Sequence, residues 1–330
     1  MPGAGAQGRT HDEQHDVVVV GGGVAGLSAA LALSRARRTV LVVDAGSPRN
    51  APAAHVHNVL GREGTSPAEL LSIGRREVTG YGGAVLGGRV SALTRTARGF
   101  HVDLADGRSV AARRLLLATG LTDELPDVPG VAGLWGRSVV FCPYCHGWEV
   151  RDRPVGVLGS GGQSAAVQAL LWRQWSDDVV LFPHTGPAPT PEEGELLAAR
   201  GVRVVEGAVA ALDVVAGALA GVRLASGDVV AREALVVSPR FTAHAGLLAG
   251  LGVEPVEQVV HGAVRGTRVP ADPTGQTEVP GVWVAGNVGD VTAQVMAAAA
   301  QGVAAASAIN VDLVLEDARA AAGPPVRDAS

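Results

Sequence analysis

The sequence predicts an α/β protein with two Rossmann-like (three-layer ββα) dinucleotide-binding domains, the second inserted into the first. A β-branched run followed at once by a glycine-rich turn, near residue 20, predicts the first domain. A similar strand and glycine turn recur near residue 155 and predict the second. A strand-and-turn segment at 279–287 indicates that both ends of the chain share one binding site, with the other domain between them.

The first motif lies within a complete strand–turn–helix–strand unit. Asp16–Val20 reads as a strand buried on both faces, because four consecutive Val leave no polar side. A helix is predicted over Leu27–Arg38 and a second strand over Thr39–Val43. This context distinguishes a dinucleotide site from a chance cluster of glycines.

Three glycines and one acid carry the chemistry of that unit. Gly21 makes the tight turn, Gly23 lets a pyrophosphate approach the backbone, and Gly26 lets helix and strand pack closely. The start of the helix offers free N–H groups to the phosphates. Asp44 closes the second strand, where its carboxylate can accept hydrogen bonds from the adenosine ribose.

The second motif departs from the nucleotide-binding pattern. A strand at 154–158 leads into the glycine turn at 159–164, and a helix is predicted to run through Trp175. Ser164 stands where a third glycine or an alanine is usual. The next strand ends in Phe182-Pro183-His184-Thr185-Gly186, with neither an acid for a ribose hydroxyl nor an Arg for a 2′-phosphate. We therefore favour a structural copy over a nicotinamide site.

A Cys pair lies between the two glycine motifs. In Cys142-Pro143-Tyr144-Cys145-His146, two residues separate the thiols, which places the sulfurs close enough to cycle between dithiol and disulfide. A structural zinc site needs two further Cys or His ligands, and the chain has no other Cys, so we predict no metal. His146 follows directly, and its imidazole suits proton transfer near neutral pH. The alternative is that it only caps the helix start.

Composition and the chain ends exclude other classes. The net charge of −5, from 27 basic and 32 acidic residues, gives no indication of nucleic-acid binding. All 27 basic residues are Arg, which excludes enzymes that hold pyridoxal phosphate on a Lys. Residues 1–15 are Gly-rich and polar, so we expect a loose tail and no secretory signal. The Ala-rich segment Val295–Ile309 predicts a packed helix rather than a membrane span. The pair Arg113-Arg114 predicts a face that is exposed to solvent. A cytoplasmic protein without a membrane partner is expected.

Taken together, these motifs resemble the low-molecular-weight thioredoxin reductase family of FAD-dependent pyridine nucleotide–disulfide oxidoreductases. The matching pieces are the first glycine motif with Asp44, Ala118-Thr119-Gly120, the Cys pair, and Val284-Ala285-Gly286-Asn287. The resemblance implies FAD as cofactor, a homodimer, and an FAD domain of residues 16–120 and 241–330 interrupted by a Cys-bearing domain at 121–240.

The resemblance also implies positions around the cofactor. Asn50 and Asn58 would lie beside the flavin ring, and Val90 would reach the adenine through its backbone. The remaining contacts would line the ribityl chain, the closing turn of the domain and the flavin's pyrimidine end: Thr119, Gly120, Gly286, Asn287, Ala293, Gln294 and Val295. A helix starting near Thr292 would direct its positive end at the ring, where electrons accumulate on reduction.

Departures from the reductase pattern favour a different direction of electron flow. Pro183-His184-Thr185 replaces the family's His-Arg-Arg cluster, which argues against NADPH, and His146 replaces its Asp. The Cys-Pro-Tyr-Cys-His form is similar to the dithiol oxidases of gliotoxin and holomycin biosynthesis. We therefore expect a small-molecule dithiol as substrate: it would attack the enzyme disulfide at Cys142 with help from His146. Electrons would pass from Cys145 through FAD to O2, giving H2O2.

Two alternatives remain open. One is a reductase that feeds a thioredoxin-like protein from NAD(P)H or another donor such as ferredoxin, because the missing Arg residues do not by themselves exclude NADH. The other is a non-catalytic flavin-binding partner or redox sensor, against which the intact Cys pair counts. The sequence does not identify the dithiol.

Overall fold

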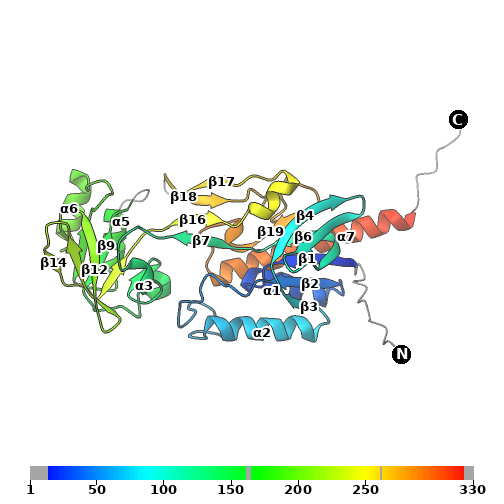
Figure 1. The fold of residues 1–330 in the computed structure, drawn as a ribbon, viewed down its shortest axis with the longest axis horizontal. Coiled ribbons are helices and arrows are strands. Elements are labelled where there is room, and N and C mark those ends of the chain that lie inside the picture. The colour runs from blue at the N-terminus through cyan, green and yellow to red at the C-terminus, as the bar shows by residue number, and fades with distance from the viewer. Residues whose placement is uncertain (1–13, 161–164, 261, 323–330) are drawn as a thin grey trace, which may run out of the picture.

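The computed structural model describes residues 14–160, 165–260 and 262–322, which form two lobes joined by a pair of strands (Figure 1). The first lobe contains the N-terminal and C-terminal parts of the chain, and the second contains the middle part with the Cys pair. The connecting strands are β7 (Leu121–Glu124) and β16 (Arg240–Ala243), which pair antiparallel. The predicted domain boundaries at 120/121 and 240/241 fall at the first residues of these two strands.

The main sheet of the first lobe has the strand order β3-β2-β1-β6-β5-β4, with β19 paired to β6. Its strands are β1 (Gln14–Val20), β2 (Val40–Asp44), β3 (Ala84–Gly87), β4 (Val90–Thr96), β5 (Gly99–Leu104), β6 (Ser109–Leu117) and β19 (Val282–Val284). β1, β2, β3, β6 and β19 run parallel, whereas β4 and β5 form an antiparallel extension. A C-terminal strand thus completes the N-terminal sheet.

Alternate valines of β1 build the core on both faces of this sheet. Val17 and Val19 pack in the cluster that includes the helices, whereas Val18 and Val20 pack in a second cluster with Leu93. The helices of this lobe are α1 (Val24–Arg35), α2 (Pro67–Gly80) and α7 (Val295–Ala322), with 3-10 turns at Gly246–Leu251 and Gly286–Val288. The run of Val predicted this double burial because neither face of the strand is polar.

The second lobe contains a parallel sheet of order β11-β10-β9-β15-β8 and an antiparallel ribbon of order β12-β13-β14. These strands are β8 (Val139–Val140), β9 (Val155–Leu158), β10 (Val179–Phe182), β11 (Arg203–Val204), β12 (Val209–Val215), β13 (Ala218–Leu224), β14 (Val229–Val230) and β15 (Ala234–Val236). Its helices are α3 (Val131–Leu134), α4 (Pro143–His146), α5 (Ala165–Trp172) and α6 (Pro191–Ala199).

A third sheet, of order β17-β18-β16-β7, links the connecting strands to the first lobe. It adds β17 (Val256–Val260) and β18 (Ala263–Arg268). The prediction of two Rossmann-like domains in an α/β protein is confirmed by this arrangement, because each lobe has its own parallel sheet flanked by helices.

Four predicted helix boundaries are wrong by three residues. α1 begins directly after Gly23 and ends before Arg37, whose positive φ of 64° is incompatible with a continued helix. α5 ends at Trp172 rather than Trp175, because the next residues form a turn whose N–H groups return to the Leu171 and Trp172 carbonyls. α7 begins at Val295 rather than Thr292, since Thr292 is held in a turn by the Asp290 carboxylate.

α7 packs along α1 at backbone contact distance. A Cβ added to Gly302 would lie 2.1 Å from the Ala25 carbonyl oxygen, so only glycine permits this approach. The opposite face is open: Met296, Val303 and Val311 are 49%, 46% and 59% exposed. By length and composition α7 is also long and apolar enough to cross a bilayer. The predicted packed helix is therefore confirmed for one face of α7.

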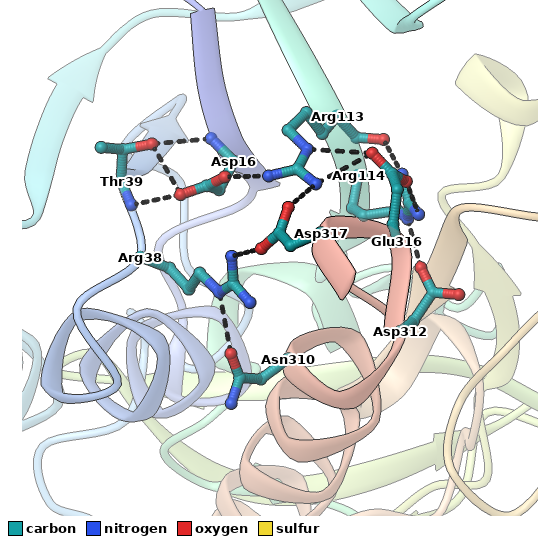
Figure 2. A network of polar contacts seen from close by, with 9 residues as sticks. All are labelled: Asp16, Arg38, Thr39, Arg113, Arg114, Asn310, Asp312, Glu316 and Asp317. Atoms are coloured by element: carbon teal, nitrogen blue, oxygen red, sulfur yellow. Dashed lines mark hydrogen bonds and ion pairs between the residues drawn. The ribbon is translucent and has the colours of Figure 1, made fainter. Parts of the chain in front are cut away.

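Ion pairs fix the end of α7 to the central strands β1 and β6 of the main sheet (Figure 2). Arg113 on β6 pairs with Asp16 at 2.8 Å and with Glu316 at 2.9 Å, and it also contacts Asp317. Arg114 pairs with Asp312 and Glu316. The expectation of a solvated face is wrong here, because the two Arg side chains are only 20% and 14% exposed. Long-range pairing, invisible in the sequence, buries them.

Candidate functional site

A cavity of about 1140 Å³ is lined by residues of both lobes. Gly21, Asp44 and Asn287 line it from the first lobe, and Cys142 and Cys145 line it from the second. The redox pair and the dinucleotide motif, which are about 120 residues apart in the sequence, therefore line the same cavity.

The glycine turn has the geometry that its spacing predicts. Gly21 has a φ of +108°, and its N–H donates to the Val43 carbonyl at 2.8 Å. A Cβ at Gly26 would lie 2.0 Å from the Gly21 carbonyl oxygen, so the third glycine allows α1 to contact the turn. A Cβ at Gly23, in contrast, would meet nothing within 4 Å, which leaves space for a phosphate at the start of α1.

Asp44 lies at the end of β2 and faces this turn. Its carboxylate accepts hydrogen bonds from the N–H groups of Gly22 and Gly46, each at 3.2 Å, and pairs with Arg75 at 3.0 Å. Open space at Gly23 and an oriented carboxylate suit the pyrophosphate and ribose of FAD, so the residues present fit the adenosine half of this cofactor. The Arg75 partner has no signal in the sequence.

Most of the positions predicted around the cofactor lie on the wall of the cavity. These are Asn50, Val90, Thr119, Gly120, Gly286, Asn287, Ala293, Gln294 and Val295, together with Gly21, Gly23 and Asp44. Two predicted residues are not among the lining residues. Gly26 packs against the turn as described, and Asn58 lies elsewhere. Their roles toward the cofactor stay predictions.

Asn58 joins its loop to the redox helix. It has a positive φ of 59°, and its side-chain amide donates to the Tyr144 carbonyl at 2.8 Å. Beside it, the His57 ring lies 2.6 Å from Glu63 and 3.4 Å from Glu149, which follows the redox turn. Residues 57–63 of the first lobe are therefore docked on the segment that carries the Cys pair.

The two thiols have different environments. Cys142 caps the start of α4, and its pKa is lowered because the Cys145 thiol donates to it, with help from the N–H groups of Cys145 and Tyr144. The same hydrogen bond and burial raise the pKa of Cys145. The Gln294 amide reaches Cys142 Sγ at 3.8 Å. In the reduced pair the negative charge therefore belongs on Cys142.

His146 is the last residue of α4 and lines the cavity. Burial lowers its pKa below the ordinary value, against the opposing effect of Glu149. Its Nδ1 is buried and has no hydrogen-bond partner among the residues that the structure describes. The ring is accordingly neutral near pH 7 and able to accept a proton.

Arg49 is a cavity residue that the sequence analysis missed. Its guanidinium donates to both carboxylate oxygens of Asp123, at 2.8 and 2.6 Å, and to Asn287 Oδ1 at 3.2 Å. Its positive charge contributes to lowering the pKa of Cys142. The only signal in the sequence is its place directly before Asn50.

The segment after β10 in the second lobe makes contacts within the chain. The Gly186 N–H donates a hydrogen bond to the Gly159 carbonyl at 3.1 Å. The Val209 N–H donates to Nδ1 of His184 at 2.9 Å. Burial lowers the His184 pKa. The segment that reads a nucleotide phosphate in nicotinamide enzymes thus forms internal bonds. Ser164 lies outside the described residues.

Comparison with known protein families gives one match over most of the chain. The family described as pyridine nucleotide-disulphide oxidoreductase matches residues 15–302.

Individual relatives agree with this match. Thioredoxin reductase tcpT of Claviceps purpurea is 32% identical over 317 residues, which cover 91% of this chain and 95% of the relative. Thioredoxin reductase aclD of Aspergillus oryzae is 39% identical over 158 residues, 44% of this chain and 48% of the relative. The crystal structure of HlmI superposes with a TM-score of 0.87 at 46% identity, covering 96% of this chain and 98% of HlmI.

Proposed function

The chain belongs to the pyridine nucleotide-disulphide oxidoreductase family, and on that basis we propose that it is an FAD-dependent dithiol oxidase. Its substrate is a small-molecule dithiol, which leaves as a cyclic disulfide, and its electron acceptor is O2, which leaves as H2O2. The observation that supports this most directly is the placement of Cys142 and Cys145 on the wall of the cavity that also holds the glycine turn and Asn287.

The residues that would hold FAD are Gly21, Gly23 and Asp44 at the adenosine end, with Asn287 and Gln294 near the Cys pair. When bound, FAD supplies a two-electron acceptor that O2 reoxidises. The family consists of flavoproteins, and the fit of the glycine turn agrees with that cofactor.

The thiol chemistry follows from the two Cys environments. A substrate thiolate attacks Cys142 Sγ of the enzyme disulfide, and Cys145 leaves as a thiolate. The second substrate thiolate then attacks the substrate sulfur of the mixed disulfide, which forms the product and releases Cys142. Cys142 is suited to leave because the N–H groups of Cys145 and Tyr144 at the start of α4 favour its thiolate form. Two electrons pass from the dithiol to the enzyme.

His146 would take the proton of the attacking thiol. It lines the same cavity, and burial keeps its imidazole neutral, which is the state of a general base. The substrate thiol is deprotonated as it attacks, because the thiolate and not the thiol is the nucleophile.

The region of the second lobe that corresponds to a nicotinamide site supports the oxidase direction over a reductase driven by NADPH. His184 is engaged with the Val209 N–H, and residues 183–186 contain no Arg to bind a 2′-phosphate. A bidentate Arg contact is the usual means of recognising that group.

An anaerobic titration followed at the flavin absorbance tests the proposal. We expect dithiothreitol to bleach the flavin and NADPH to leave it unchanged, with H2O2 formed in proportion to the dithiol once air is admitted. A Cys142→Ser variant is the control, since it lacks the disulfide and should not be bleached by dithiols. Rapid bleaching by NADPH would contradict the proposal.

The second candidate function is reduction of a thioredoxin-like protein. The relative tcpT is named a thioredoxin reductase, and Tyr144 and Trp148 beside the redox turn are 58% and 66% exposed. Exposed aromatic side chains there would suit a protein partner. This candidate predicts bleaching by a nicotinamide cofactor or another donor, and reduction of thioredoxin in the same assay.

A further inference from the structure

Arg49 joins three segments that are far apart in the sequence. It lies in the loop after β2, and its bidentate partner Asp123 lies in the connecting strand β7, where the Asp side chain is only 9% exposed. Its third N–H group reaches Asn287 in the turn after β19. The guanidinium also lies over the Phe241 ring of β16, 5.1 Å from its centroid. Arg49 thus contacts both connecting strands.

Asn287 continues this chain of contacts toward the redox pair. Its Oδ1 accepts from Arg49, while its Nδ2 donates to the carbonyl of Asp290 at 3.1 Å and of Ala293 at 2.9 Å. These three bonds use the amide as both acceptor and donor, which a carboxylate at this position could not do. The residue after Ala293 is Gln294, whose amide reaches Cys142 Sγ.

We propose that Arg49 is a positioning residue of the redox centre. Through Asn287, Arg49 holds the turn that places Gln294 beside Cys142. Through Asp123, it fixes the position of that turn relative to β7, which leads to the second lobe. The proposal rests on the proposed function, because it assigns Arg49 a part in the thiol chemistry of that site.

An Arg is needed here for its shape. The planar guanidinium offers N–H groups in fixed directions, two to Asp123 and one to Asn287. A Lys would keep the charge but, as a single ammonium group on a flexible stem, could not satisfy both partners in this geometry. Arg49→Lys therefore separates the positioning effect from the effect of charge on the Cys pair.

The first test compares Arg49→Lys with the matched control Arg223→Lys. Arg223 makes the same bidentate contact with Asp213, at 3.0 and 2.7 Å, on the ribbon of the second lobe. The activity-independent measurement is alkylation of reduced Cys142 by iodoacetamide as a function of pH, located by peptide mass. We expect Arg49→Lys to change the rate at pH 7 by about threefold or more, and Arg223→Lys to leave it unchanged.

Steady-state oxidation of dithiothreitol gives the second measurement. We expect Arg49→Lys to lower kcat about tenfold or more, with KM within about twofold, because displaced reacting groups slow the chemical step rather than entry of the dithiol. Wild-type values in both measurements would overturn the proposal. Absence of dithiol oxidation in the wild type would count against the proposed function, while the alkylation profiles would still decide the role of Arg49.

Coupling to Asn287 is tested by the double variant. Asn287→Asp keeps an acceptor for Arg49 but removes the donor to Ala293. If Arg49 acts through Asn287, Arg49→Lys should lower kcat by less than about twofold in the Asn287→Asp background. A full tenfold loss in that background would show that the two residues act independently, and would overturn this part of the proposal.

Discussion

At the scale of single residues, Cys142, Cys145 and His146 differ in the direction and cause of their pKa shifts. All three lie within one turn of chain, yet hydrogen bonding lowers the pKa of Cys142 and raises that of Cys145, and burial lowers that of His146. The spacing of the pair was readable in the sequence. The difference between the thiols was not, because it depends on which thiol the backbone N–H groups face.

The pH dependence of dithiol oxidation should follow the protonation of the His146 imidazole. Its folded pKa lies below the ordinary 6.5, so the neutral, basic form persists to lower pH and the rate should fall only below about pH 6.5. His146→Gln should remove this acid limb and lower kcat/KM about 100-fold at pH 7.

The measurement is kcat/KM for dithiothreitol between pH 5 and 8. His101→Gln is the control, because His101 lies on β5 and pairs with Asp103 away from the cavity. An acid limb that survives in His146→Gln would assign the base to another group.

At the scale of elements, the network at the end of α7 links a helix to two strands of the main sheet. Burial raises the pKa of Asp16 and Glu316, but hydrogen bonds from Thr39 and Arg113 to Asp16, and from Arg114 and Arg113 to Glu316, outweigh it. The pKa of Asp317 is lowered by Arg38 and Arg113. All three carboxylates are therefore more acidic in the folded chain than in the unfolded chain.

This network predicts an acid-sensitive contribution to stability. Because the folded pKa values are lowered, the contribution is fully present above about pH 4 to 5 and is lost as the pH falls through those values. Arg113→Ala should lower the free energy of unfolding by about 1–3 kcal/mol at pH 7 and by less at pH 3.

Denaturant unfolding at the two pH values gives the comparison. Arg98→Ala is a suitable control, because Arg98 lies on the exposed β4–β5 turn. An equal loss at pH 7 and pH 3 for Arg113→Ala would mean that packing of the Arg stem, and not its ion pairs, stabilises the contact between α7 and the main sheet.

At the scale of the whole molecule, α7 presents an open apolar face. Met296, Val303, Val311 and Val314 are each about half exposed along one helix, which is more apolar surface than a solvated helix usually presents. We propose that a second copy of the chain covers this face. The ion pairs at its end and the backbone contact with α1 favour a helix that stays in the first lobe.

Val303→Asp should shift the protein from dimer to monomer in sedimentation velocity. Burying an unpaired carboxylate in an apolar interface costs several kcal/mol, so the effect at micromolar concentration should be close to complete. Val214→Asp on β12 is the matched control, since both Val side chains are 46% exposed. A monomeric wild type, or wild-type protein that floats with lipid vesicles, would contradict the proposal.

Sequence reasoning located the first strand–turn–helix–strand unit and the C-terminal strand and helix of the first lobe, and most of the residues that it predicted around the cofactor line the cavity. Gly21, Gly26 and Asp44 could be interpreted because their roles depend on neighbours close in the chain. Arg49 could not, because its partners Asp123 and Asn287 are 74 and 238 residues away. The family resemblance implied that Asn58 lies beside the flavin ring, whereas in the structure its side-chain amide donates to the Tyr144 carbonyl.

By itself, the sequence determined two Rossmann-like domains, a Cys pair and a missing phosphate-binding Arg cluster, because local spacing and residue type suffice for those features. Only the tertiary structure decided which groups meet: Cys142 with Gln294 and Arg49 with Asn287 in the cavity, and His184 with Val209 elsewhere in the second lobe. The physical reason is that thiol acidity and hydrogen-bond partners depend on burial and on long-range contacts. Neither is encoded in the spacing of residues along the chain.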